Sequence, residues 1–466
     1  MMNGVKNGVL NNNKYSKSRE TFWLFFVLIV YKVILDYVFD NGMYIFSDMG
    51  NLTHDSTRIY VSWLLYIIQT LFIASAVATR SNISSVIYML LFCVNGVGFY
   101  SMFGRLKTHQ DGCFALVNLF WMIFTLCILF RFRISKKSIK ESYNSNREKP
   151  EISVSPMVDQ SSTLFKTIAI KKSEIYLFAL VALASVLLSG IYGSFRLLTS
   201  FDDVYLYRMN LNMPTLVGYA FRFLSGVFLP YFFVRFTINK RYFLSVTTLI
   251  LAVFLFSVDG LKTNLVLYAV ILGFYFVIKL IIAPKGKPVT RIASIVILGL
   301  SVFLFFNLVG YNMSGEYLFL NEMYRVLIIP SNIAVRYYNF IEPQEALLLR
   351  ESIMRVFFES PYDRSINYIV STTVTEYGEA VANTGMFGDA YANFKIFGVI
   401  IYPIIYAFII KQWEKINKNR VDAFSLSVGF IMIWNAINIS FFTWLLTGGV
   451  LIYFIITATF ISKNKN

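Results

Sequence analysis

Apolar residues recur in windows of roughly 20 positions along almost the whole chain, with short polar stretches between them. A helix of that length crosses about 30 Å of hydrocarbon and bonds its backbone amides internally, as lipid requires. The pattern predicts an all-α, polytopic integral membrane protein with about twelve transmembrane helices. The windows lie near residues 21–39, 59–79, 82–103, 113–130, 175–194, 215–236, 242–258, 261–282, 292–311, 393–410, 422–441 and 444–461.

Two polar intervals interrupt this pattern and divide the chain. The first is basic and rich in Ser and Asn, which predicts a flexible linker. The second is the only long interval after residue 175 that is too polar to lie in a membrane, and it predicts a large, partly helical external cap. The predicted division is residues 1–130 (a tail and four helices), 131–174 (the linker), 175–311 (five helices with a short external loop at 195–214), 312–392 (the cap) and 393–466 (three helices and the C-terminus).

The cap has a predicted structure of its own. Two helices are expected at residues 321–329 and 331–341, because Pro330 forces a kink or a break between them. A third helix is predicted over residues 342–359, where a proline stands in the first turn. Residues 360–389 are dense in Ser, Thr, Asn and Gly, which removes helical periodicity and predicts a loop.

Composition and charge support the membrane assignment and orient it. The hydrophobic fraction is 57%, the mean hydropathy is +0.60 and only 15% of residues are charged, which excludes an ordinary soluble chain. Lys and Arg outnumber Asp and Glu by 42 to 26. About two thirds of these bases fall in one alternate set of loops, so they indicate orientation and not nucleic-acid binding. That set includes both termini, which are therefore predicted to be cytoplasmic, with the cap outside.

Cysteine and histidine are scarce. The chain has three cysteines and two histidines, and neither type occurs at the spacing of a zinc site. We therefore expect no disulfide framework, no metal and no other cofactor.

All five basic residues of the cap are arginines. The planar fork of arginine binds phosphate or pyrophosphate through two hydrogen bonds, and its charge is permanent. Arginines in an acidic segment can equally pair with neighbours, and the spacing of Arg355 from Glu351 and Glu359 favours that for Arg355. Arg350 remains open between the two interpretations. The candidates for binding an anionic substrate are Arg325, Arg336 and Arg364.

Basic residues near the spans supply further candidates. Arg196 and Arg208 lie in the short external segment, where they could bind substrate or meet lipid headgroups. Lys262 starts a predicted span directly after a tight turn, and it is a possible anion ligand.

Acidic residues have two predicted roles. Lys32 and Asp36 stand four positions apart inside the first span, so we expect them to neutralise one another. A carboxylate of the cap near the membrane could instead act as a general base, if burial raised its pKa toward neutrality. The catalytic candidates are Glu376 and Asp389, with Glu379 and Asp363 as alternatives.

The cap closes on the run Ala382-Asn-Thr-Gly-Met-Phe-Gly-Asp-Ala-Tyr-Ala-Asn-Phe394, which Ile396-Phe-Gly398 follows. This run, together with a large external loop before the last three of about twelve spans, resembles the bacterial oligosaccharide repeat-unit polymerases, the Wzy-type O-antigen and capsule polymerases. Lys395 stands where the pattern would have a glycine.

The resemblance implies a glycosyltransferase of the bacterial inner membrane that works on the periplasmic face without metal or nucleotide sugar. It would move a growing glycan from undecaprenyl pyrophosphate onto a new lipid-linked repeat unit, with a polysaccharide chain-length regulator as a candidate partner. Arginines would bind the departing pyrophosphate, and a cap carboxylate would receive the proton of the acceptor hydroxyl. Asn383 and Tyr391 of the run would bind substrate, the tyrosine through a sugar face.

Three other functions remain open. A flippase for lipid-linked oligosaccharides would carry ionisable residues along a central cavity, whereas charge here is concentrated in the cap. An O-antigen ligase uses the same donor, but that family is expected to place a histidine in the large external loop, and residues 311–394 contain none. A purely structural membrane protein is the third.

Overall fold

Helices make up most of the protein. The computed structural model describes residues 2–42, 53–80, 82–106, 111–129, 169–195, 212–260, 262–281, 288–315, 324–352, 354, 357–372, 383–417 and 422–462. No β-strand occurs in these ranges, and ten of their helices are long and apolar enough to cross a membrane. Two shorter apolar stretches lie at Asn264–Gly273 and Ala423–Asn438. The predicted all-α fold of a polytopic membrane protein is confirmed. Most predicted windows lie on one continuous helix, but those at residues 393–410, 422–441 and 444–461 each cross an interruption.

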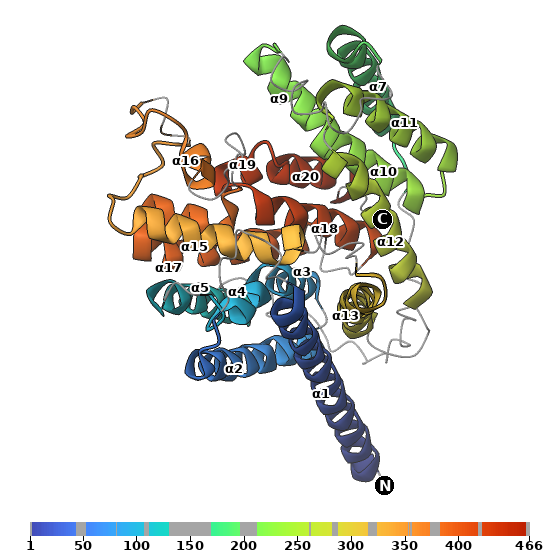
Figure 1. Ribbon diagram of the computed structural model, residues 1–466. Helices are drawn as coiled ribbons and strands as arrows, with labels where there is room; N and C mark the ends of the chain where they lie inside the picture. Colours follow the sequence, from blue (N-terminus) through green and yellow to red (C-terminus); the bar gives the residue numbers. More distant parts are fainter. Residues whose placement is uncertain are drawn as a thin grey trace, which may run out of the picture.

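The helices form three groups in chain order (Figure 1). The first contains α1 (Met2–Gly42), α2 (Ser56–Arg80), α3 (Ile83–Leu91), the π-helical turn η3 (Phe92–Gly96), α4 (Val97–Met102) and α5 (Asp111–Leu129). The second contains α7 (Lys172–Gly193), α9 (Thr215–Phe223), the π-helical turn η5 (Leu224–Phe228), α10 (Leu229–Ile238), α11 (Tyr242–Asp259), α12 (Lys262–Ile281) and α13 (Pro288–Ser314). The third contains the π-helical turn η6 (Tyr324–Ile328), α15 (Ile329–Ile341), α16 (Ile366–Thr372), α17 (Gly385–Ile416), α18 (Ala423–Asn438), α19 (Phe441–Leu445), α20 (Val450–Ile456) and the π-helical turn η8 (Thr457–Ser462).

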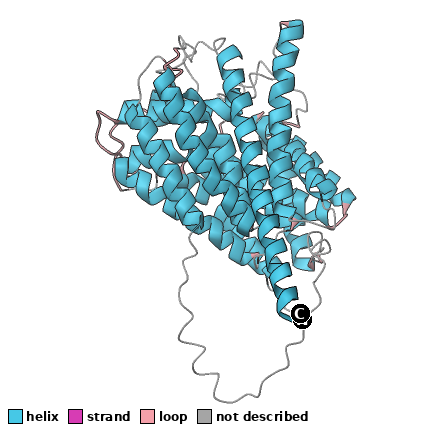
Figure 2. Ribbon diagram, turned by 90° about the horizontal axis from the view of Figure 1, so that it is seen from below, coloured by secondary structure: helices cyan, strands magenta, loops and turns pink. Residues whose placement is uncertain are grey.

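One helix of the third group joins the other two groups. α18 packs against α3 on one side and against α10 and α12 on another, so it lies in the middle of the bundle. Figure 2 shows the same bundle seen from below, with the helices running alongside one another.

Contacts between helix ends agree with the predicted sidedness of the loops. Segments assigned to the same face by the charge pattern are found in contact, and which of the two faces is cytoplasmic stays a prediction. On the face with the basic loops, the contacting pairs are Thr290 Oγ1 with Glu20 Oε2 (3.4 Å), Lys171 Nζ with the Thr459 carbonyl (3.2 Å) and Asn82 Nδ2 with Glu414 Oε2 (3.0 Å). On the face predicted to be external, Arg58 Nε binds Asp111 Oδ1 at 2.8 Å.

A π-helical turn in the third span docks two other helices. Such a turn widens the helix and frees backbone carbonyls for outside partners. At η3, the hydroxyl of Tyr31 in α1 donates to the Cys93 carbonyl, and the hydroxyl of Ser331 in α15 donates to the Asn95 carbonyl, both at 3.1 Å. The start of α15 is thereby held against the first group.

Three buried charged side chains and the partly buried Asp40 lie together between α1 and the end of α4. The predicted pair is confirmed, because Lys32 Nζ lies 2.9 and 2.8 Å from the two carboxylate oxygens of Asp36. The same ammonium lies 4.3 Å from the ring centroid of Trp63. Arg105 binds Asp40 at 2.5 and 3.0 Å and lies 3.6 Å from Asp36. Two cations thus balance two anions, which lowers the cost of burying each of them.

Two predictions for the cap are wrong. Residues 342–359 were expected to be a helix, but the described part forms turns, because Leu348 and Leu349 take φ values of 49° and 65° that a right-handed helix excludes. Conversely, α16 and the start of α17 lie within the predicted loop at residues 360–389. Ile366 and Val370 of α16 are buried one turn apart, so packing outweighs the polar composition there.

The predicted break at Pro330 is a change of helix type. The described helix begins as the π-helical η6 and continues as α15, with Pro330 in the first turn of α15. Proline is tolerated there because the first amides of a helix have no intrahelical partner. The chain therefore passes this point without a separate turn.

α17 is a helical hairpin with a sharp corner at Lys395, the position where the sequence pattern would have a glycine. Lys395 has φ 47° and ψ −130°, a conformation that interrupts the helix. A Cβ on Gly398 would lie 1.9 Å from the carbonyl oxygen of Ala390. Ala390 and Gly398 would be about 12 Å apart along a straight helix, so the chain must turn back between them. We name residues 385–394 limb a and residues 396–416 limb b.

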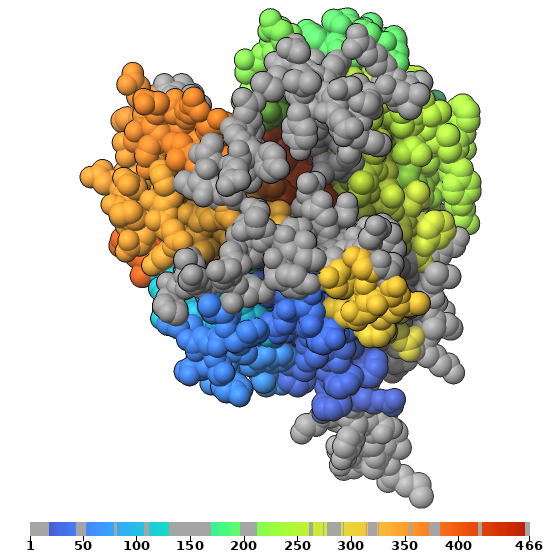
Figure 3. Space-filling view, viewed as in Figure 1, coloured from blue at the N-terminus to red at the C-terminus, as the bar shows by residue number. Residues whose placement is uncertain are grey.

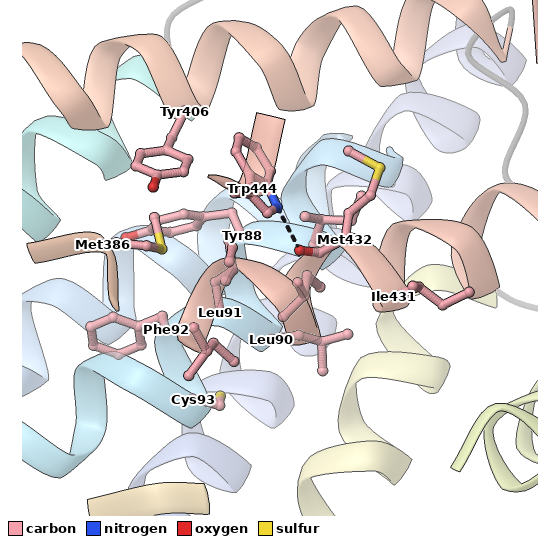
Figure 4. Packing of buried hydrophobic residues seen from close by; sticks show 14 of the residues in the cluster. Tyr88, Leu90, Leu91, Phe92, Cys93, Met386, Tyr406, Ile431, Met432 and Trp444 are labelled. Carbon is pink, nitrogen blue, oxygen red and sulfur yellow. Dashed lines mark hydrogen bonds between the residues drawn. The ribbon is translucent and has the colours of Figure 1, made fainter. Parts of the chain in front are cut away.

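Both limbs run along α5. The ring of Phe387 in limb a lies 6.2 Å from that of Phe120, and Tyr406 in limb b lies 6.4 Å from Phe124, one helical turn away. Figure 4 shows Met386 and Tyr406 close together although they belong to different limbs.

The hairpin changes where the tenth predicted span begins. Limb b alone is about 31 Å long, which is enough to cross the hydrocarbon. The helix starts at Gly385 and not at residue 393, and residues 386–393, most of which were assigned to the external cap, are buried inside the bundle. The cap therefore contributes directly to the membrane-embedded core.

Candidate functional site

Amide and hydroxyl side chains meet where limb a begins and α18 ends. The Asn383 amide donates to Asn438 Oδ1 at 3.1 Å, and the hydroxyl oxygens of Ser440 and Thr443 lie 2.8 Å apart. Next to Asn383, the Thr384 hydroxyl donates to an amide oxygen of α16 at 3.3 Å. We call this group the polar floor, and its members are Asn367, Asn383, Thr384, Asn438, Ser440 and Thr443.

The polar floor lies between the two ends of the spans. Phe387 of limb a packs on Phe120, which is about 14 Å along α5 from its start at Asp111. From the other face, α18 begins at Ala423 and runs about 23 Å before it reaches Asn438. Both measures put the floor at the depth of the lipid tails that surround the bundle.

Helices are interrupted around the polar floor. α18 ends in an extended residue, Ile439 (φ −125°, ψ 159°), and Gly449 (φ 85°) precedes α20. Irregular backbone at membrane depth is tolerated only where protein buries it or where it lines a water-filled cavity. Asn383 is exposed, and every other member of the floor except Thr384 is partly exposed. Figure 3 shows C-terminal residues, in dark red, recessed at the centre of this face.

A tyrosine of α15 holds one side of the floor. Tyr337 donates its hydroxyl to Asn367 Oδ1 at 2.6 Å. Burial raises the pKa of Tyr337 above its ordinary value of 10.0, so the hydroxyl stays protonated and remains a donor. Limb a can approach this ring because a Cβ on Gly388 would already lie 3.2 Å from it. The small residue in limb a therefore permits α15, α16 and α17 to meet at the floor.

Two of the predicted arginines flank this side of the site. Arg336 precedes Tyr337 on α15, is partly buried, and donates from Nε to Asn332 Oδ1 at 3.3 Å. Arg364 is exposed just before α16, and its guanidinium carbon lies 4.9 Å from the ring centroid of Tyr368. Stacking on a ring leaves the edge of a guanidinium available for hydrogen bonds to an anion. Arg336 thus lies next to the tyrosine that is hydrogen-bonded to the floor, and Arg364 lies two residues before α16, which carries Asn367.

Asp389 connects limb a to α19. Its Oδ2 accepts a hydrogen bond from the Phe441 amide at 2.8 Å, and its Oδ1 accepts one from Asn393 Nδ2 at 3.0 Å. Asn393 in turn accepts from the Leu349 amide at 2.9 Å. Because both carboxylate oxygens hold backbone or side-chain donors, this geometry gives Asp389 a positioning role. Its role as a general base stays a prediction.

Among Glu376 and the other predicted substrate-binding residues, only two have side chains that the structure describes. Asn383 belongs to the polar floor, as described above. Tyr391 is buried between Tyr338 and Phe387, with ring centroids 4.9 and 6.0 Å away, so it contributes to the packing of limb a. Outside what the structure describes lie the side chains of Arg325 and Lys262 and the whole of Arg196, Arg208 and Glu376.

Most of the polar floor was not predicted from the sequence. Asn367 and Thr384 fall in the interval predicted as loop, where polar residues are expected and carry no signal. Ser440 and Thr443 lie where two predicted windows nearly touch, and this close approach was the available sign that a helix is interrupted there.

The described residues contain no group of three or more His, Cys, Asp or Glu side chains that could hold a metal ion. The chain was also compared with protein-family models, with curated proteins and with solved structures, and none of the three comparisons found a match.

Proposed function

We propose that the protein joins undecaprenyl-pyrophosphate-linked oligosaccharide repeat units into a surface polysaccharide, O-antigen or capsule, at the outer face of the bacterial inner membrane. The observation that carries this proposal is the polar floor: uncharged amides and hydroxyls, partly exposed at the depth of lipid tails, with arginines on the adjoining helices. Such groups can donate hydrogen bonds to, and accept them from, the hydroxyls of a glycan that is still attached to a membrane lipid.

The proposed reaction has four parts: attack, bond cleavage, stabilisation of the leaving group and proton transfer. The acceptor sugar hydroxyl attacks the anomeric carbon of the donor glycan, while the bond from that carbon to the pyrophosphate oxygen breaks. The pyrophosphate leaves with the electron pair and is stabilised by Arg336 and Arg364. The hydroxyl proton passes to a carboxylate. Since both oxygens of Asp389 are engaged, Glu376 is the preferred base in this proposal.

Deleting the gene in its bacterial host tests the class of function. The expected result is surface lipid that carries single repeat units and no ladder of longer chains on a gel, because units would still be made, exported and attached. Complementation with the intact gene should restore the ladder. Loss of all glycan from the surface would contradict a polymerase and would point to a flippase or a ligase.

Replacing the two arginines tests the site. Arg336→Ala and Arg364→Ala should each slow polymerisation by about 10²–10³-fold, because each removes a donor that stabilises the departing pyrophosphate. The measurement is chain length on the same gel, with membrane insertion checked by immunoblotting of the membrane fraction. Arg241→Ala, an exposed arginine on the opposite face, is the matched control and should leave the ladder unchanged. Wild-type ladders in both site variants would remove the pyrophosphate role.

One observation favours a flippase as the second candidate. Helices that break near the middle of the membrane are typical of transport proteins, where the interruption forms the substrate site. Around the polar floor, α18 ends and α17 and α20 begin. The deletion experiment separates the two candidates, since a flippase mutant leaves no repeat units at the surface.

A further inference from the structure

Three large apolar side chains are exposed on the turns between α15 and α16, outside every candidate span. Phe357 is 75% exposed, Leu348 is 56% exposed and Phe358 is 54% exposed. Single apolar residues on a surface are common, but two adjacent phenylalanines with a nearby leucine form a patch that calls for a partner. We call residues 342–362 the apolar arm.

The apolar arm is held firmly to the protein. The amides of Leu347 and Leu348 donate to the carbonyls of Ala392 and Asn393, at 3.0 and 3.1 Å, just before the corner of α17. At its far end, Tyr362 packs on Phe340 of α15 with ring centroids 5.5 Å apart. The exposed patch is therefore presented by a fixed support at both ends of the arm.

Its two phenylalanines are fixed as well. The amides of Phe357 and Phe358 both donate to the Met354 carbonyl at 2.9 Å, which places the two side chains on one tight turn. Ser360 accepts a hydrogen bond from the Tyr362 amide at 3.1 Å and closes the next turn. The patch is thus part of an ordered turn.

One member of the patch, Leu348, lies beside the start of limb b, which presents an apolar surface to lipid. Limb b crosses the membrane and begins at the corner, so the corner marks the edge of the hydrocarbon. Leu348 is hydrogen-bonded two residues before that corner. The exposed apolar residues of limb b lie on one face from its first turn onward and are Ile396, Phe397, Ile400, Ile401, Ile404 and Phe408.

The arm lies at the end of the helices where the corner is found. In Figure 1 it extends past the left ends of α15 and α17, next to α16. Charged side chains accompany the apolar ones: Lys395 donates to the Glu342 carbonyl at 3.1 Å, and Glu345 and Glu359 are exposed. Apolar groups flanked by charges suit the boundary between acyl chains and headgroups.

We propose that the apolar arm is an interfacial membrane anchor, which seats Leu348, Phe357 and Phe358 in the acyl-chain boundary of the outer leaflet. The ligand is the phospholipid bilayer itself. The arm would thereby hold α15 and α16, and with them Asn367 of the polar floor, at a constant depth. This inference stands on the exposed patch and its connection to limb b, and it holds whichever reaction the protein performs.

Spin labels on single cysteines test the anchor. The full-length protein, with its three native cysteines replaced by alanine, is reconstituted in vesicles of phosphatidylethanolamine and phosphatidylglycerol. Labels at Phe357→Cys and Phe358→Cys are compared for access to oxygen, which concentrates in lipid, and to a water-soluble nickel chelate. Phe397→Cys is the lipid-facing reference, and Gln344→Cys, an exposed polar position of the same arm, is the aqueous reference.

The expected result is preferential access to oxygen at 357 and 358, as at 397, with the opposite preference at 344. Nickel access at 357 and 358 equal to that at 344 would overturn the anchor, and so would protection from both reagents, which indicates a protein contact. A second test keeps an aromatic ring at the position. The fluorescence of the tryptophan introduced by Phe357→Trp should be quenched by lipids brominated near the headgroup end of the chain, and that of the tryptophan introduced by Gln344→Trp should not. Equal quenching of the two variants would also overturn the proposal.

Discussion

Replacing Arg235 by methionine is expected to lower the free energy of unfolding by about 3–5 kcal/mol, because it leaves a buried carboxylate without its cation. Arg235 is 2% exposed and Glu174 is 0% exposed. The guanidinium binds both carboxylate oxygens, at 3.0 and 3.1 Å, and thereby ties the end of α10 to the start of α7. Unfolding of the purified full-length protein in detergent, followed against temperature or denaturant, measures the effect.

Two further variants make this test specific. The double variant Glu174→Gln, Arg235→Met should recover much of the loss, since no unpaired charge is then buried. Arg241→Met removes an exposed arginine near the same helix end and should change stability by less than about 0.5 kcal/mol. If Arg235→Met unfolds like the wild type, or if the double variant is no more stable than the single one, the pair does not join the two helices as described.

Gly398→Ala is expected to be the second most damaging change, because a methyl group at this position collides with backbone. Its Cβ would lie 1.9 Å from the Ala390 carbonyl oxygen and 2.7 Å from the carbonyl carbon. A flexible side chain could move aside, but the backbone of the opposite limb cannot do so without opening the hairpin. The loss of stability should reach or exceed the roughly 1–3 kcal/mol that is typical of overpacking. Loss of polymer in cells should accompany it, since limb a carries Thr384 and Asn383 into the polar floor.

Two glycine variants complete this test. Gly299→Ala in α13 meets nothing within 4 Å, so it should leave stability unchanged or raise it through better helix propensity. Lys395→Gly should have the opposite effect from Gly398→Ala and raise the free energy of unfolding by about 1 kcal/mol, because glycine adopts the positive φ of the corner without strain. A neutral Gly398→Ala variant would mean that the two limbs do not meet closely.

The membrane fold was predictable because it depends on local pattern. A window of roughly 20 apolar residues can satisfy its backbone in lipid only as a helix, whatever its neighbours are. The ends of α2 and α5 therefore lie within a few residues of the predicted windows. Lys32 and Asp36 were predictable for the same reason, since a spacing of four on a helix brings two side chains together without help from the rest of the chain.

The cap was predicted poorly because its structure depends on packing. Polar composition indicated a loop at Gly385–Asp389, but glycine and alanine in limb a allow close contact with Tyr337 and α5, and this packing forms a helix. Pro343 indicated the start of a helix. Leu348 and Leu349 instead take left-handed backbone conformations beside the hairpin corner. Neither outcome is encoded in the spacing of the residues concerned.

The sequence by itself determined the spans, their helical nature and the grouping of basic loops, because hydrophobic length and charge act over one helix at a time. Only the tertiary structure decided the α17 hairpin, the Glu174–Arg235 pair and the polar floor. Each of these joins residues that are distant in the chain, and their contact depends on how helices stack. Helix packing in turn depends on small residues and on helix interruptions that let two backbones come close together. The local pattern of polar and apolar residues does not predict which backbones do so.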